Sequence, residues 1–204
     1  MTNQDAQTPP EQPPVPEADP QTIAALERLA PRARQVLVTG VTLIVLGTAA
    51  LTIMAVSTVV SIVPIGIVLI LGAVFEMGVG HHAQGGPDGP VNAWHKAGSM
   101  LAFTGLVAAL APVLPSVVFT TLAGLALMAA GWIRLRATSF TPLRQKSAIV
   151  PVAASVSILI GVLLVTRWSG DNLVAAGNLL ALELVATGWG FVGLGLTLSR
   201  LRRN

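Results

Sequence analysis

VLVTGVTLIVLGTAALTIMAV, residues 36–56, is the stretch that decides the fold. It holds no charged residue, and about 20 apolar residues in a helix cover the roughly 30 Å of hydrocarbon in a bilayer. A second apolar run of similar length, residues 58–79, follows after a short turn that contains Ser and Thr. Two such runs in close succession predict a transmembrane helical hairpin.

The remainder of the chain continues this pattern. We predict further spans at residues 97–114, 116–133, 147–166 and 173–198, a flexible loop at 81–90 (HHAQGGPDGP) and a basic loop at 134–146. Only 10% of the residues are charged and 53% are apolar, whereas soluble domains carry about 25% charged residues. The expected fold is therefore all-α, an integral membrane bundle of six transmembrane helices over residues 36–199.

The two ends of the chain have a different composition. Residues 1–20 alternate proline with acidic and amide residues, which predicts a disordered cytoplasmic tail. In residues 21–35, Ile23, Leu26 and Leu29 recur every three positions among arginines. That pattern indicates either an amphipathic helix on the membrane surface or a solvated lead-in to the first span. Residues 200–204 form a short basic C-terminus.

The Lys and Arg residues predict the orientation. With six spans, both termini and the second and fourth loops share one side of the membrane and hold eleven of the twelve basic residues. Only Arg167 lies on the other side. Because cytoplasmic loops are enriched in Lys and Arg, we expect a multi-pass protein with both termini in the cytoplasm.

An internal repeat relates the predicted spans. Gly66 and Gly124 stand in similar apolar contexts, and Ala181 follows Gly124 at almost the same interval along the chain. Glycine-rich apolar helices can align by chance, but a steady period favours one helical hairpin used three times. Small residues then let neighbouring helices approach closely. The glycines expected at helix contacts are Gly47, Gly66, Gly105, Gly124, Gly131, Gly161 and Gly188.

This layout has a known counterpart. Three hairpins with glycine-rich even-numbered spans, and a last span reading LLALELVATGWGFVGLGL (residues 179–196), resemble the HdeD-type acid-resistance membrane proteins of bacteria. The resemblance extends over about residues 36–201. It implies a role in acid or envelope stress tolerance at the bacterial inner membrane, and it supplies no catalytic residue. The proline-rich tail and the loop at 81–90 depart from the family pattern, so no shared cytoplasmic partner is implied.

Glu183 is the most informative side chain. It lies about ten residues into the last predicted span, where a carboxylate costs about 2.5–3.5 kcal/mol on insertion scales. Such residues usually face the interior of a bundle, and burial there favours the protonated form. Two interpretations stay open: a proton-responsive group, or a neutral carboxylic acid that is hydrogen-bonded to a neighbouring helix.

Other polar residues support weaker hypotheses. Glu76 is predicted to be an interfacial charge near the cytoplasmic end of the second span. His81, His82 and His95 border the loop at 81–90. Imidazoles change charge near physiological pH, so these three are candidate cytoplasmic pH sensors, although a solvated loop is the simpler interpretation. Their spacing fits no known metal motif, and we expect no metal ligand.

The sequence contains no cysteine, no G-x-S-x-G motif, no Walker A motif and no H-E-x-x-H motif. We therefore expect no catalytic residue, no cofactor and no enzymatic activity. No basic stripe interleaved with aromatics is present, so nucleic acid is not an expected partner. The expected partners are the lipid bilayer and other membrane proteins or a second copy of the chain. A non-enzymatic stress protein is the leading hypothesis; the alternative is a small transporter or proton-conducting channel that uses Glu183.

Overall fold

The computed structural model describes residues 27–56, 62–84, 93–139, 148–168, 170 and 172–201. These ranges contain six α-helices and no strand: α2 (Ala33–Val56), α3 (Val63–Gln84), α4 (Ala93–Ala109), α5 (Ser116–Ser139), α7 (Ile149–Val165) and α8 (Leu173–Leu201). Two short 3-10 helices, η1 (Ala30–Arg32) and η2 (Ala111–Val113), precede α2 and follow α4. The predicted all-α class is confirmed for the described part of the chain.

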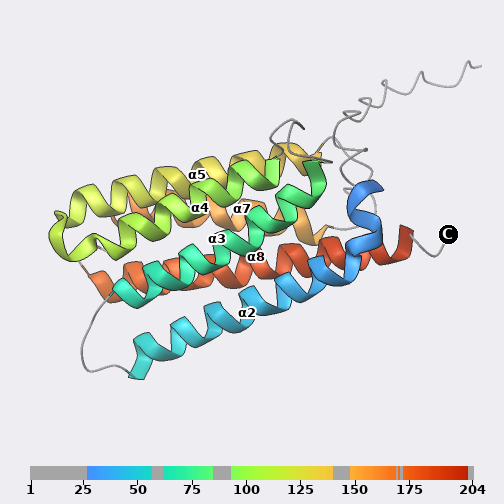
Figure 1. Ribbon diagram of the computed structural model, residues 1–204. Coiled ribbons are helices and arrows are strands. Elements are labelled where there is room, and N and C mark those ends of the chain that lie inside the picture. Colours follow the sequence, from blue (N-terminus) through green and yellow to red (C-terminus); the bar gives the residue numbers. More distant parts are fainter. Residues whose placement is uncertain are drawn as a thin grey trace, which may run out of the picture.

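The helices run alternately up and down (Figure 1). The start of α2 and the end of α8 therefore lie together, at what we call the terminal end of the bundle; the opposite end is the far end. Local sequence sets several helix starts. Pro64 and Pro151 stand in the first turns of α3 and α7, where a backbone N–H has no partner within the helix. The Asn172 side-chain oxygen accepts hydrogen bonds from the backbone of Val174 and Ala175 and caps α8.

The outer surface of the bundle is suited to lipid. Four helical stretches are long and apolar enough to cross a bilayer: Glu27–Met54, Val63–Ala83, Ser116–Thr138 and Leu173–Arg200; Ile149–Val165 is apolar but shorter. Large apolar side chains point outward from several helices, among them Val45, Ile67 and Leu159, each more than half exposed. A soluble protein rarely exposes that much apolar surface. The chain is a multi-pass membrane protein.

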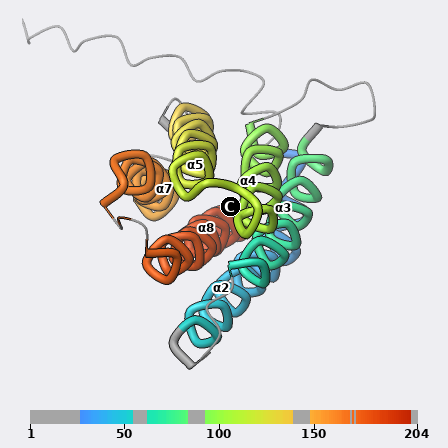
Figure 2. Tube along the Cα trace, turned by 90° about the vertical axis from the view of Figure 1, so that its left-hand side faces the viewer, coloured from blue at the N-terminus to red at the C-terminus, as the bar shows by residue number. Residues whose placement is uncertain are grey.

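The helices form three close pairs, α2 with α8, α3 with α4, and α5 with α7 (Figure 2). Glycines allow this proximity: a Cβ atom on Gly66 would lie only 2.7 Å from the carbonyl oxygen of Gly105. Small residues that the predicted repeat makes equivalent meet at all three crossings: Gly66 with Gly105, Gly124 with Gly161, and Ala181 with Gly47. Each pair joins helices from two different predicted hairpins. The pair of α2 and α8 closes the bundle into a ring.

A second level of close contacts lies nearer the terminal end. A Cβ atom on Gly131 would meet the carbonyl oxygen of Ala154 at 2.8 Å, and one on Gly188 would meet that of Gly40 at 2.7 Å. Both distances are to backbone atoms, which cannot move aside as a flexible side chain can. The glycines named from the sequence thus stand where neighbouring backbones nearly touch.

Several helix ends differ from the prediction, among them the start of α4, and two of the differences place polar residues inside helices. Helix α3 continues to Gln84, so the first four residues of the predicted loop are helical; there Ala83 is buried, and Gly80 lies against the backbone of His95. Helix α5 continues to Ser139, so Arg134 belongs to a helix and not to a basic loop. Both helices extend beyond their apolar runs because they still pack against neighbouring helices there, as the buried side chains of Ala83 and Thr138 show. Residues 85–92 and 140–147 lie outside the described residues.

Only part of the N-terminal prediction falls on residues that the structure describes. The proposed tail, residues 1–20, and residues 21–26 of the possible surface helix lie outside the described residues, as do 202–204 of the basic C-terminus. The chain is helical at residues 27–29 and then passes through η1 into α2. Leu29 is 1% exposed and belongs to the core. This residue therefore anchors the start of the described chain to the bundle.

Candidate functional site

Three charged side chains from three helices meet inside the bundle. Arg134 on α5 is 9% exposed, and Glu76 on α3 and Glu183 on α8 are both fully buried. Charged groups are seldom buried unless they are paired, and inside a membrane they usually mark function. We call these residues, together with Ser157 and Thr187, the ion cluster.

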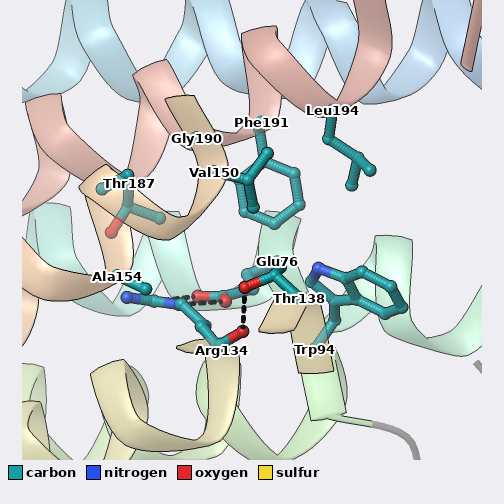
Figure 3. A pocket seen from close by; sticks show the side chains of 11 residues that line it. Glu76, Trp94, Arg134, Thr138, Val150, Ala154, Thr187, Gly190, Phe191 and Leu194 are labelled. Atoms are coloured by element: carbon teal, nitrogen blue, oxygen red, sulfur yellow. Dashed lines mark hydrogen bonds and ion pairs between the residues drawn. The ribbon is translucent and has the colours of Figure 1, made fainter. Parts of the chain in front are cut away.

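Arg134 and Glu76 form a two-pronged ion pair. The Nε of Arg134 donates to Oε1 of Glu76 at 2.9 Å, and its Nη2 donates to Oε2 at 2.6 Å. Figure 3 shows the carboxylate of Glu76 lying against the guanidinium. Both carboxylate oxygens act as acceptors in this parallel arrangement, the strongest that arginine makes with a carboxylate.

Glu183 receives its hydrogen bonds on one oxygen only. Its Oε1 accepts from Nη1 of Arg134 at 2.9 Å, from the hydroxyl of Ser157 at 2.8 Å and from the hydroxyl of Thr187 at 3.0 Å. Arg134 Nη1 also donates to Ser157 Oγ at 3.1 Å. The second oxygen, Oε2, is buried and has no hydrogen-bond partner. The two carboxylates are therefore held very differently.

A pocket adjoins the ion cluster. It is a half-open hollow between α3, α4, α5, α7 and α8, with about 360 Å³ of space when the open solvent at its mouth is counted. Figure 3 shows Trp94 and Phe191 beside the buried ion pair. The polar part of the wall is formed by Glu76, Arg134, Thr138 and Thr187, and the rest by Trp94, Val150, Ala153, Ala154, Gly190, Phe191 and Leu194.

The predicted site residues are distributed unevenly. Glu183 lies in the ion cluster and faces other helices. His81 and His82 are exposed on the last turn of α3, with ring centres 6.1 Å apart, and His95 is half-buried on the first turn of α4. The three histidines do not join the ion cluster, and no three His, Asp or Glu side chains converge as metal ligands within the described residues.

The sequence-based interpretation of Glu76 was wrong. Glu76 was expected at the membrane interface and is fully buried, because Arg134 reaches it from α5. The signal was present in the sequence: Arg134 follows Glu76 by 58 residues, the same interval that separates Gly66 from Gly124. Phe191, which lines the pocket, stands at the third equivalent position, almost one further interval along the chain. The repeat thus brings one acid, one base and one aromatic ring to the same level.

Comparison with known protein families agrees with this internal repetition. The model of a short repeat of unknown function (DUF308) matches residues 38–92 and again residues 97–166, together more than half of the chain. The chain belongs to this repeat family. The starts of the two DUF308 matches, at positions 38 and 97, are separated by nearly the period of the glycines. The family includes the HdeD-type membrane proteins. No curated protein and no solved structure matches the chain significantly.

Proposed function

We propose that this chain is a non-enzymatic protein of the bacterial inner membrane that contributes to tolerance of acid or envelope stress. In this proposal it crosses the membrane six times with both termini in the cytoplasm, as three copies of one hairpin arranged in a ring. Membership of the DUF308 family, which includes HdeD-type proteins, supports the assignment. The observation that supports a response to acid is the ion cluster, a set of ionisable side chains buried inside a hydrophobic bundle.

A proton-conducting channel or small transporter is the second candidate. The pocket beside Arg134 favours it, because the pocket brings free space to buried ionisable groups. Conduction also requires polar groups on the other side of the ion cluster. Between Glu183 and the far end, the described residues carry no charged side chain before Arg167. The buried hydroxyls there, Thr104 and Thr120, donate to carbonyl oxygens of their own helices. This arrangement favours a side chain that responds to protons over a continuous proton path across the membrane.

Survival of a deletion strain at low pH tests the proposed function. The wild-type gene should restore survival, and the Glu183→Gln variant, which keeps a donor and an acceptor but cannot exchange a proton, should reach the membrane and fail to protect. Glu27→Gln is the matched control, because Glu27 is an exposed carboxylate outside the ion cluster.

Two results would contradict the proposal. A deletion strain that survives acid and envelope stress as well as its parent would remove the stress role. Full protection by a normally expressed Glu183→Gln protein would leave Glu183 as a structural residue. Proton flux into liposomes that contain the purified protein, if abolished by the same substitution, would instead favour the channel.

A further inference from the structure

We infer that Oε2 of Glu183 is a proton-binding site, and that the proton reaches it from the terminal end of the bundle through the pocket and the hydroxyl of Thr187. This inference rests on the proposed function and names the group that responds, together with the side of the membrane from which it is addressed.

The first argument is the charge of the ion cluster. With all groups ionised, one guanidinium faces two carboxylates, which leaves one excess negative charge inside the bundle. An uncompensated charge in a low-dielectric interior is very costly, and groups in that position bind a proton instead. Helix α2 supplies no compensation, since its only charged residue, Arg34, stands at its start. On α4, His95 and Lys96 lie in the first turn, and Lys96 is exposed. One added proton makes the ion cluster neutral.

Geometry decides which carboxylate carries that proton. Both oxygens of Glu76 accept hydrogen bonds from Arg134, so a proton on either oxygen would face an N–H donor. On Glu183 only Oε1 is engaged. Its Oε2 has no hydrogen-bond partner although the side chain is fully buried. A proton there breaks no bond of the ion cluster, and leaving a neutral hydroxyl unpaired costs less than leaving a charged oxygen unpaired.

Thr187 connects Glu183 with the pocket. Its side chain lines the pocket, and its hydroxyl donates to Oε1 of Glu183 at 3.0 Å. Glu76, Arg134 and Thr138 add polar groups to the same wall. A buried water needs two to four polar partners, and this wall provides them. A water in the pocket that carries an excess proton can pass it to the hydroxyl of Thr187 while that hydroxyl passes its own proton to Oε1 of Glu183. A half-turn of the carboxyl group about its Cγ–Cδ bond then places the protonated oxygen at the Oε2 position and returns an unprotonated oxygen to the donors.

The pocket belongs to the terminal end. Trp94 and Val150, which line it, are the second residues of α4 and α7, and Thr138 is the last but one of α5. All three of these helix ends lie at the terminal end (Figure 1). Under the predicted topology this end faces the cytoplasm. Glu183 should therefore follow the pH of the cytoplasm, so that the protein responds when acid has entered the cell.

Infrared difference spectroscopy of the full chain in vesicles tests the site. Across a pH titration the wild-type protein should show the C=O band of a protonated carboxyl at the acid end and lose it at the alkaline end, and Glu183→Gln should lack this band. In vesicles of uniform orientation, a pH step on the terminal side should produce the band several-fold faster than a step on the far side. A band unchanged in Glu183→Gln, equal rates from both sides, or displacement of the proton by sodium ions at constant pH would overturn the inference.

Variants of Thr187 test the route without touching the carboxylate, and they remain informative if Glu183→Gln does not fold. Thr187→Val should slow formation of the band several-fold, and Thr187→Ser should restore the rate. Thr197→Val is the matched control, because Thr197 is equally buried on α8 but donates only to the carbonyl oxygen of Gly193. A wild-type rate in Thr187→Val would refute the route. Spectroscopy on purified protein is independent of cell survival, so a normal band together with a deletion strain that tolerates acid would contradict the proposed function alone.

Discussion

Replacing Arg134 with methionine should be among the most destabilising single changes in this protein. The substitution keeps most of the side-chain volume but removes the guanidinium that both Glu76 and Glu183 contact. Two buried carboxylates then lack a counter-charge. One of them can be neutralised by a proton, but Glu76 had both oxygens committed to Arg134 and loses both of those hydrogen bonds.

The expected magnitude follows from the pairing. Removing one partner of a buried ion pair typically costs about 3–5 kcal/mol. A Coulomb estimate agrees: two unit charges about 4 Å apart attract by about 4 kcal/mol at an effective dielectric constant near 20. The matched control is Arg136→Met, two residues along the same helix. The guanidinium of Arg136 is exposed and lies 5.1 Å from the centre of the Trp132 ring, a contact worth about 0.5–1 kcal/mol.

Reversible unfolding in mixed detergent micelles, followed by the fluorescence of the four tryptophans, measures both free energies. The double variant Glu76→Met/Arg134→Met should regain most of the loss, because replacing a whole buried pair with apolar groups is often nearly neutral. If Arg134→Met were no less stable than Arg136→Met, the ion cluster would not hold the bundle together. A double variant as unstable as Arg134→Met would assign the loss to packing and not to charge.

Three further predictions concern other parts of the molecule. Gly66→Ala should lower the free energy of unfolding by about 1–3 kcal/mol, because its Cβ would lie 2.5 Å from the backbone nitrogen of Ala109; Gly78→Ala, which would meet nothing within 4 Å, should be neutral or slightly stabilising in the same unfolding assay. Replacing His81 and His82 together with alanine should leave survival at low pH unchanged, and a loss would move the acid response from the ion cluster to these histidines. Periplasmic activity is expected from reporter fusions placed after Thr58, Pro115 and Ser169, and a cytoplasmic signal at any two of these would refute the six-span topology.

Helix positions could be read from the sequence because hydrocarbon imposes one simple requirement, a long apolar run. The runs located the helices, but they ended too early wherever a helix continued beside a neighbour outside the apolar layer. Gln84 and Ser139 show this, since α3 and α5 extend to them past polar residues. Composition reports what faces lipid, whereas helix ends are also set by contacts within the protein.

The candidate site could be predicted only in part. Glu183 stood out because a carboxylate in the middle of an apolar span is costly, so its presence indicates a structural or functional role. Its counter-charge was missed because Arg134 opens the polar segment Arg-Leu-Arg, which resembles the edge of a loop. Whether a residue near a helix end points into water or into the bundle depends on rotation about the helix axis, which apolar composition does not reveal. The available clue was that Glu76 and Arg134 are separated by the repeat interval itself.

The pairing of α2 with α8 has a consequence for how the protein is made. Translation delivers α2 to the membrane well before α8, yet the glycine faces of these two helices fit each other. Until α8 is made, α2 must remain in lipid with Gly40 and Gly47 uncovered while the four α-helices that the structure describes between α2 and α8 are inserted. A ribosome that stops short of α8 would release a product whose first helix has no companion, a form that quality-control proteases in the membrane could distinguish from the finished protein.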